Sequence, residues 1–182
     1  DVFSNLDMGA MAAYRGEKGR WAVMADMIYM DLGTTVEGPL GFETDVGFDQ
    51  WLLELDGSYR LSRVTEVLFG VRYVGLSGDA LFHGPIQDRR VDYDKSWVDP
   101  LVGLRFPIPL GKKWTFVGRG DIGGFGVESD LTWMVMGAAG YSISESIDLL
   151  IAYQHLDADY ENGDFVYDAA TSGFAVGVSF AL

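Results

Sequence analysis

Apolar and polar residues alternate along most of this chain, and residues 48–60 show the pattern most clearly. Every second residue from Trp51 to Tyr59 is apolar or glycine, whereas the positions between them include Glu54 and Asp56. Successive side chains of a β-strand point to opposite faces. The stretch is therefore predicted to be a strand with one apolar face and one charged face.

The same period of two recurs through the chain, and no segment sustains a helical period. It predicts nine strands, at residues 7–14, 21–32, 48–60, 65–76, 96–106, 114–126, 131–141, 147–155 and 171–182. Short turns at 15–20, 61–64, 107–113 and 142–146 are expected to alternate with long loops at 33–47, 77–95 and 157–170. Pro100 lacks a backbone donor, so a bulge or break is expected there. The predicted fold is an all-β, antiparallel up-and-down meander.

Alternation alone leaves open whether the apolar face points into a water-free core or outward to lipid. A soluble barrel or sandwich has the first arrangement and a transmembrane barrel the second. Water-exposed sheet surfaces usually carry lysine, which protects and solubilises them. All four lysines of this chain lie in predicted turns or loops, at positions 18, 95, 112 and 113. This distribution favours a charged face that lines a confined interior.

Aromatic residues mark both ends of several apolar faces. Three pairs are each eight residues apart: Trp21 and Tyr29, Trp51 and Tyr59, and Trp133 and Tyr141. Eight residues of a tilted strand rise about 20 Å, close to the apolar band of an outer-membrane barrel. Amphipathic rings prefer the headgroup level of a bilayer. These six residues are therefore predicted to form membrane girdles.

Together with the contrast between short turns and long loops, these features predict a transmembrane β-barrel whose apolar face contacts lipid. The charged face would then line the lumen. The predicted lumen charge network consists of Asp26, Glu54, Asp56, Arg72, Asp99, Arg105, Arg119 and Asp121. Glu66 and Asp148 are expected nearer the turns.

Composition excludes several other classes of protein. The 182 residues are expected to form a single domain, residues 1–182, and a hydrophobic fraction of 48% is too high for a disordered chain. No run of 18 apolar residues predicts a transmembrane helix. A formal net charge of −14 argues against nucleic acid as a partner. The chain has no cysteine, and without a signal peptide it is interpreted as the processed form if it is exported.

Three runs of the sequence resemble small outer-membrane β-barrel proteins of Gram-negative bacteria, a largely uncharacterised group related in architecture to OmpA- and OmpW-type barrels. The runs are WVDPLVGLRFPIPL (97–110), GDIGGFGVESDLTW (120–133) and LLIAYQHLDADY (149–160). The likeness covers nearly the whole chain and implies location in the bacterial outer membrane. Such relatives carry one further strand before the position of Asp1. Counting also favours ten strands, because bacterial barrels have an even number and this chain supplies nine; a nine-strand closure is the alternative.

The predicted role is non-enzymatic and structural, with lumen charges paired into a plug. A narrow pore for ions or small solutes is the first alternative, and five acids against three arginines would favour cations there. An outer-membrane hydrolase using His155, Asp157 or His83 is the second.

The expected partners are the lipid bilayer and lipopolysaccharide, with a protein partner at the outer loops also open. No cofactor is expected. Calcium or magnesium is a weaker possibility at an acidic loop, because hard cations bind several oxygens on flexible loops. The candidate ligands there are Asp157, Asp159, Glu161 and Asp168.

Overall fold

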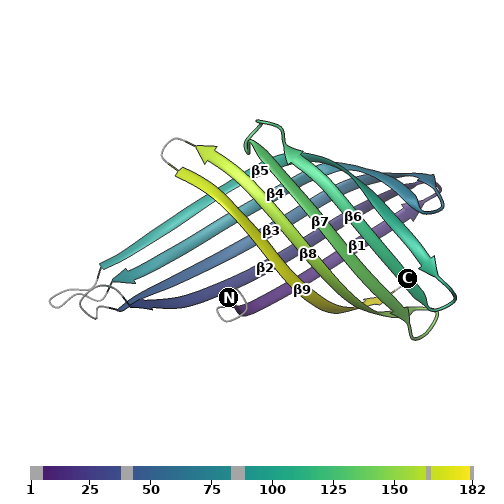
Figure 1. The fold of residues 1–182 in the computed structure, drawn as a ribbon, viewed down its shortest axis with the longest axis horizontal. Helices are drawn as coiled ribbons and strands as arrows, with labels where there is room; N and C mark the ends of the chain where they lie inside the picture. The colour runs from purple at the N-terminus through teal and green to yellow at the C-terminus, as the bar shows by residue number, and fades with distance from the viewer. Residues whose placement is uncertain (1–5, 38–42, 83–88, 163–164, 181–182) are drawn as a thin grey trace. The chain divides into compact units, whose positions relative to one another are not determined.

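A computed structural model of the chain is all-β, with nine strands among the residues that it describes (Figure 1). The structure describes the backbone of residues 6–37, 43–82, 89–162 and 165–180. The strands are β1 (Leu6–Lys18), β2 (Trp21–Glu37), β3 (Glu43–Ser62), β4 (Thr65–Phe82), β5 (Arg89–Leu110), β6 (Trp114–Gly124), β7 (Leu131–Ser142), β8 (Ile147–Asn162) and β9 (Phe165–Phe180). No helix of the described residues is long and apolar enough to cross a membrane.

Each strand is hydrogen-bonded to the next one along the chain, so the sheet order runs from β1 to β9 without a crossover. The predicted up-and-down meander is therefore confirmed. The pairs from β5 to β9 are antiparallel, and β7 is paired over its whole length, from Leu131 opposite Asp159 to Ser142 opposite Asp148.

The three predicted long loops are wrong, because most of their residues belong to strands. Of the described residues, 33–37 belong to β2 and 43–47 to β3, 77–82 to β4 and 89–95 to β5, and 157–162 to β8 and 165–170 to β9. The β8–β9 ladder continues through Asp159 opposite Asp168 to Asn162 opposite Phe165. Aromatic and β-branched residues in this region suit a strand even though its hydropathy is low. Pairing between β8 and β9 therefore makes both strands longer than the hydropathy pattern predicts.

The expected break at Pro100 is also absent, because β5 runs without interruption from Arg89 to Leu110. The short turns are confirmed in place but are tighter than predicted. One of them, at residues 111–113, begins at Gly111, whose φ of 81° is in the region that glycine tolerates best.

The chain divides into two compact units. The first consists of residues 1–14, 25–54 and 72–98, and the second of residues 15–24, 55–71 and 99–182. The second unit contains all of β6 to β9, together with the ends of β1 to β5 that meet at the short turns. We call these ends the turn end.

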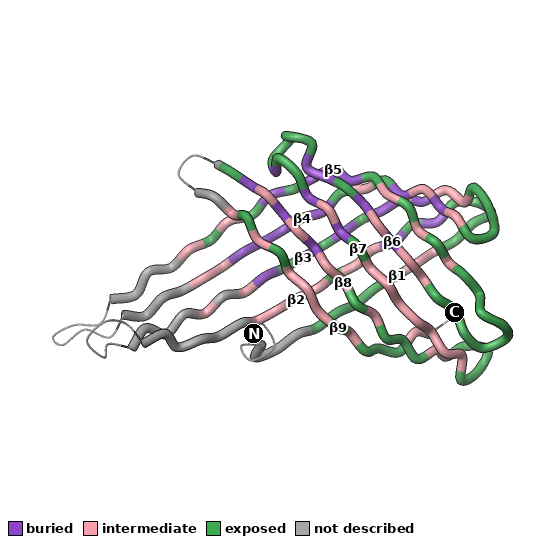
Figure 2. Tube along the Cα trace, viewed as in Figure 1, coloured by how far each residue is buried: buried purple, intermediate pink, exposed green. Residues whose placement is uncertain are grey.

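Exposed and buried residues alternate along the strands (Figure 2). In β9 the apolar side chains of Phe174, Val176 and Val178 are exposed, and Val176 is 83% exposed. In β6 the charged side chains of Arg119 and Asp121 are buried. The apolar face of the sheet is thus the exposed one, and the charged face is the buried one.

Candidate functional site: the charged face of the strands

A buried carboxylate lies at the turn end of the charged face. Glu66, at the start of β4, has a side chain that is only 1% exposed. Nη2 of Arg15 lies 2.9 and 3.0 Å from its two carboxylate oxygens, and Nη1 of Arg105 donates a 3.1 Å hydrogen bond. Nε of Arg60 lies 3.4 Å from Oε1. Charge-assisted bonds of this kind offset the large cost of burying an ionised group.

We call this set the Glu66 cluster: Glu66, Arg15, Arg60, Arg105 and Glu17. Its residues come from β1, β3, β4 and β5, and all lie in the second unit. Since β1 and β4 are not neighbours in the sheet order, the contact from Arg15 to Glu66 crosses the charged face. Sequence reasoning placed Arg105 with the other lumen charges, Arg15 in a predicted turn and Arg60 at the end of the predicted strand 48–60. Their shared partner is 51 and 6 residues away respectively.

Glu17 completes the cluster on its solvent side. Its carboxylate accepts 2.7 Å hydrogen bonds from Nε of Arg15 and Nη2 of Arg60. The bond from Arg15 is the main reason that the pKa of Glu17 is lowered, and the bond from Arg60 adds to it. The same carboxylate raises the pKa of Arg60. Two glutamates thus face three arginines.

A second buried group surrounds Arg119. Its Nε lies 2.9 Å from Oδ2 of Asp121, and its Nη1 lies 3.1 Å from Oδ2 of Asp56. Asp56 belongs to β3 and Arg119 to β6, so this contact also crosses the charged face within the second unit. Glycine makes the approach possible: a Cβ on Gly103 would lie 2.5 Å from Cβ of Asp121, and one on Gly70 would collide with Asp56.

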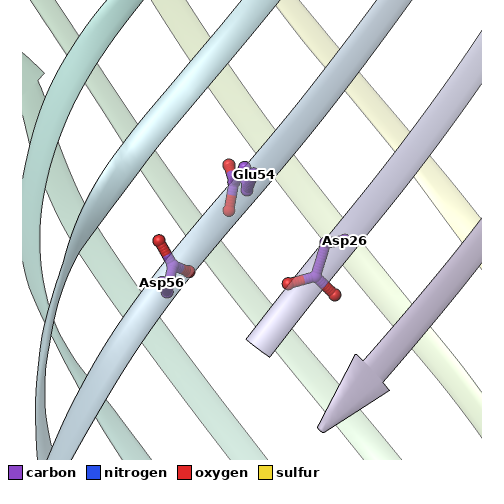
Figure 3. Close-up of side chains that lie close together, drawn as sticks. All are labelled: Asp26, Glu54 and Asp56. Atoms are coloured by element: carbon purple, nitrogen blue, oxygen red, sulfur yellow. The ribbon is translucent and has the colours of Figure 1, made fainter. Parts of the chain in front are cut away.

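In the first unit, Arg72 and Glu54 form a buried ion pair with an Nε–Oε1 distance of 2.6 Å. Asp26, on β2, has a carboxylate oxygen within 4.8 Å of one of Glu54 on β3. Figure 3 shows the side chains of Asp26 and Glu54, together with Asp56, which follows Glu54 two residues later on the same strand. Carboxylates so close suit a cation chemically, but acidic clusters commonly exist without one.

Asp99 has a different kind of partner from the one that sequence reasoning expected. Its Oδ1 accepts a 3.0 Å hydrogen bond from the backbone N–H of Ser129, and its Oδ2 a 2.6 Å bond from the hydroxyl. Both residues are fully buried. The predicted lumen residue therefore also fixes the connection between β6 and β7.

Beyond these charges, the buried face of the second unit becomes apolar. It carries Leu101, Met134, Leu156, Ala158 and Tyr160, all less than 5% exposed. Sequence reasoning missed Leu156, Ala158 and Tyr160, because the predicted strand ended at His155 and residues 157–170 were interpreted as a loop. Alternation continued past His155 would have placed Leu156, Ala158 and Tyr160 on one face.

The predicted girdle residues meet across neighbouring strands. In the first unit, the rings of Tyr29 and Trp51 have centroids 4.6 Å apart, and the Tyr29 hydroxyl donates a hydrogen bond to Asp49. In the second unit, Trp21 and Tyr59 lie 4.8 Å apart, edge to face.

The remaining pair lies on β7, within the second unit. Trp133 contacts the His155 ring at 4.9 Å, and Tyr141 contacts Trp114 at the same distance. Both ends of the apolar face of β7 are thus marked by aromatic contacts.

His155 lies on the same side of β8 as the exposed Ile151 and Tyr153, and its Nδ1 is 2.6 Å from Oγ of Ser172. His83, the other histidine considered, lies outside the described residues. The acidic residues considered as metal ligands lie on strands, with Asp159 directly opposite Asp168.

Comparisons of the chain with protein-family models, with curated proteins and with solved structures each return no match.

Proposed function

We propose that this protein is an integral outer-membrane β-barrel protein of a Gram-negative bacterium, with a structural, non-enzymatic role and a lumen closed by paired charges. The observation that carries the proposal is the inverted burial of the two sheet faces. Large apolar side chains such as Phe174 and Val176 are exposed, whereas Glu54, Arg72 and Asp99 are buried.

Inverted burial is unfavourable in water and favourable in a bilayer. Removing a Val, Leu or Phe side chain from water is worth about 1.5–3 kcal/mol, so a face lined with them is stabilised by hydrocarbon. In a closed barrel no strand edge is left, so the backbone N–H and C=O groups of every strand find hydrogen-bond partners on neighbouring strands. This matters in a bilayer, because lipid tails offer no such partners. The proposal therefore includes closure of the sheet into a barrel, through the tenth strand expected from counting or, as the alternative, directly between β1 and β9.

The partners in this proposal are the bilayer and lipopolysaccharide. The aromatic contacts at both ends of β7 would lie at the two headgroup levels, where amphipathic rings are most stable. The acidic residues at the end opposite the turns would face the outside of the cell, where divalent cations or a protein partner would screen them.

A pair of arginine substitutions on adjacent residues of β9 tests the proposal. Phe174 is opposite Tyr153, which is opposite Gly137, midway between Trp133 and Tyr141 on β7. Phe174→Arg places a charge at the proposed bilayer midplane, which costs about 2–4 kcal/mol in such barrels. The matched control is Gly173→Arg on the charged face, where a new Cβ meets nothing within 4 Å.

We expect Phe174→Arg to reduce folding into phosphatidylcholine vesicles severely and Gly173→Arg to fold nearly as well as wild type, both measured by protease protection. Wild-type protein that stays monodisperse without detergent, with Phe174→Arg equally stable, would refute the proposal.

A further inference from the structure

The connection between β6 and β7 has an unusual backbone for so short a segment. Gly124, Phe125 and Gly126 have φ values of 85°, 54° and 69° in succession. Glycine adopts this region freely, but a bulky aromatic residue does so only when the surrounding structure requires it. Phe125 is the only non-glycine residue with positive φ in the described part of the chain.

Four hydrogen bonds, two of them buried, hold this connection in place. Asp99 accepts two bonds from Ser129, at 3.0 and 2.6 Å. The N–H of Gly126 donates to the carbonyl of Ser129 at 3.0 Å. The N–H of Asp130 donates to the carbonyl of Asp159 on β8 at 2.9 Å. A side chain on Gly124 would lie 2.7 Å from the Ser129 carbonyl oxygen, so only glycine fits there. The connection is therefore rigidly attached to β5 and β8.

This rigid segment presents apolar side chains to the outside. Phe125 is 52% exposed and Val127 is 64% exposed. Leu131, also exposed, begins β7 two residues before Trp133, the aromatic residue that contacts His155. At a strand tilt near 40°, two residues rise only about 5 Å. The apolar side chains of the connection thus lie just beyond the aromatic level of β7.

We propose that Phe125 and Val127 form an interfacial anchor that inserts into the headgroup region of the bilayer. This inference rests on the proposed outer-membrane function. Lipid is the occupant that fits, because the two side chains continue the exposed apolar face past the aromatic residues. The headgroup and interfacial region extends about 5–8 Å beyond the hydrocarbon on each side, far enough to contain them.

The neighbouring charges and strand lengths agree with a location at the membrane surface. β6 and β7 have 11 and 12 residues, against 20 for β3 and 22 for β5, so the connection does not project far beyond the girdle level. The acidic side chains of Glu128 and Asp130 are exposed, as headgroup or water contact requires. The fold therefore holds two apolar side chains, on a constrained backbone, at the level where a bilayer interface would cover them.

Single-cysteine labelling tests the anchor directly, because the chain has no cysteine of its own. Phe125→Cys and Val127→Cys would each carry an environment-sensitive fluorophore in phosphatidylcholine vesicles. Phe174→Cys reports the bilayer midplane, and Glu161→Cys reports an exposed position on β8 farther from the girdle. Nitroxide lipids labelled near the headgroup or near the chain end provide shallow and deep quenchers.

We expect the labels at 125 and 127 to be quenched at least about twofold more by the shallow lipid than by the deep one. The label at 174 should show the reverse order, and the label at 161 little quenching by either. Quenching at 125 and 127 no greater than at 161, with 174 still quenched, would overturn the anchor and leave the outer-membrane proposal intact. Absence of quenching at 174 as well would overturn both.

Ser129→Ala provides a second measurement at full chain length. It removes the 2.6 Å bond to Asp99 but keeps the backbone donor, so the barrel should still fold. We expect the label at Val127 to become more mobile, with lower fluorescence anisotropy and a weaker preference for the shallow quencher. Unchanged anisotropy would show that Asp99 and Ser129 do not position the anchor.

Discussion

Glu66 is the residue on which most of the charges at the turn end converge. A buried carboxylate bonded to several arginines is costly to remove, because the arginines then repel one another and the exposed Glu17 balances them only in part. We predict that Glu66→Gln destabilises the folded protein by about 3 kcal/mol, as measured by urea unfolding in vesicles.

Glu17→Gln is the matched control, since it neutralises a carboxylate of the same cluster that is exposed to solvent. Its effect should stay below about 1 kcal/mol, as for other exposed ion pairs. In addition, Glu66→Gln combined with Arg105→Gln should cost less than the sum of the single changes, since the two groups are in contact. Equal effects of the two glutamate substitutions would contradict a buried role for Glu66.

The lowered pKa of Glu17 predicts how the stability of the folded protein depends on pH. Its pKa in the folded protein lies below the usual 4.5, so the unfolded chain binds the proton more readily. The stabilisation from its bonds to Arg15 and Arg60 is therefore complete above pH 4.5 and is lost as the pH falls through the lowered pKa. The unfolding midpoint of wild type should exceed that of Glu17→Gln at pH 7, and the two should converge in acid. A difference that grows on acidification would show the opposite sign of shift.

The charge pairing illustrates what sequence can and cannot provide for single residues. Alternation placed Asp56, Arg119 and Asp121 on one face, and they are in contact. It gave no means of pairing Arg15 with Glu66, because that pair depends on how β1 and β4 approach across the charged face. The bond from Ser129 to Asp99 likewise depends on the backbone of a connection that has no repeating pattern.

For the strands, hydropathy predicted the central segments well and their ends poorly. The core of β8, from Ile147 to His155, is strongly alternating and was assigned as a strand. Its continuation, Asp157 to Asn162, is acidic and polar, yet it is paired with β9 residue by residue. Backbone hydrogen bonding to a neighbour extends these ends, and in β8 Ala158 and Tyr160 extend the buried face as well. The local sequence of one strand does not indicate how long the neighbouring strand is.

Proline shows the same difference between a local rule and its context. A missing donor at Pro100 suggested a break in β5, and Pro107 and Pro109 were assigned to the following turn. In the structure β5 is continuous through all three, with Pro107 opposite Val117 and Pro109 opposite Thr115. Extended backbone is compatible with the fixed φ of proline, so the loss of single donors does not end a long strand that is paired along its length.

For the whole molecule, the decisive question is whether the proposed lumen conducts. The Glu66 cluster and the Arg119 group each form contacts across the charged face of the second unit, and such contacts would close a narrow barrel. We therefore predict no measurable ion current for the wild-type protein in planar bilayers. Insertion would be verified independently by protease protection of the same preparation in vesicles.

Removing both members of the contact between Glu66 and Arg105 should open the turn end without changing the net charge of the Glu66 cluster, because one carboxylate and one guanidinium are removed together. We expect the double variant Glu66→Ala and Arg105→Ala to pass an ohmic current in the same bilayers. The charged face would then retain six acids against four arginines, so the reversal potential in a salt gradient should show a preference for cations. The retained charges are Glu17, Asp26, Glu54, Asp56, Asp99 and Asp121 against Arg15, Arg60, Arg72 and Arg119. Val176→Ala, which shortens an exposed apolar side chain, is the control for altered insertion. A cation-selective current from the wild type itself would refute the plugged lumen and support the narrow pore. The paired charges would then line a continuous path.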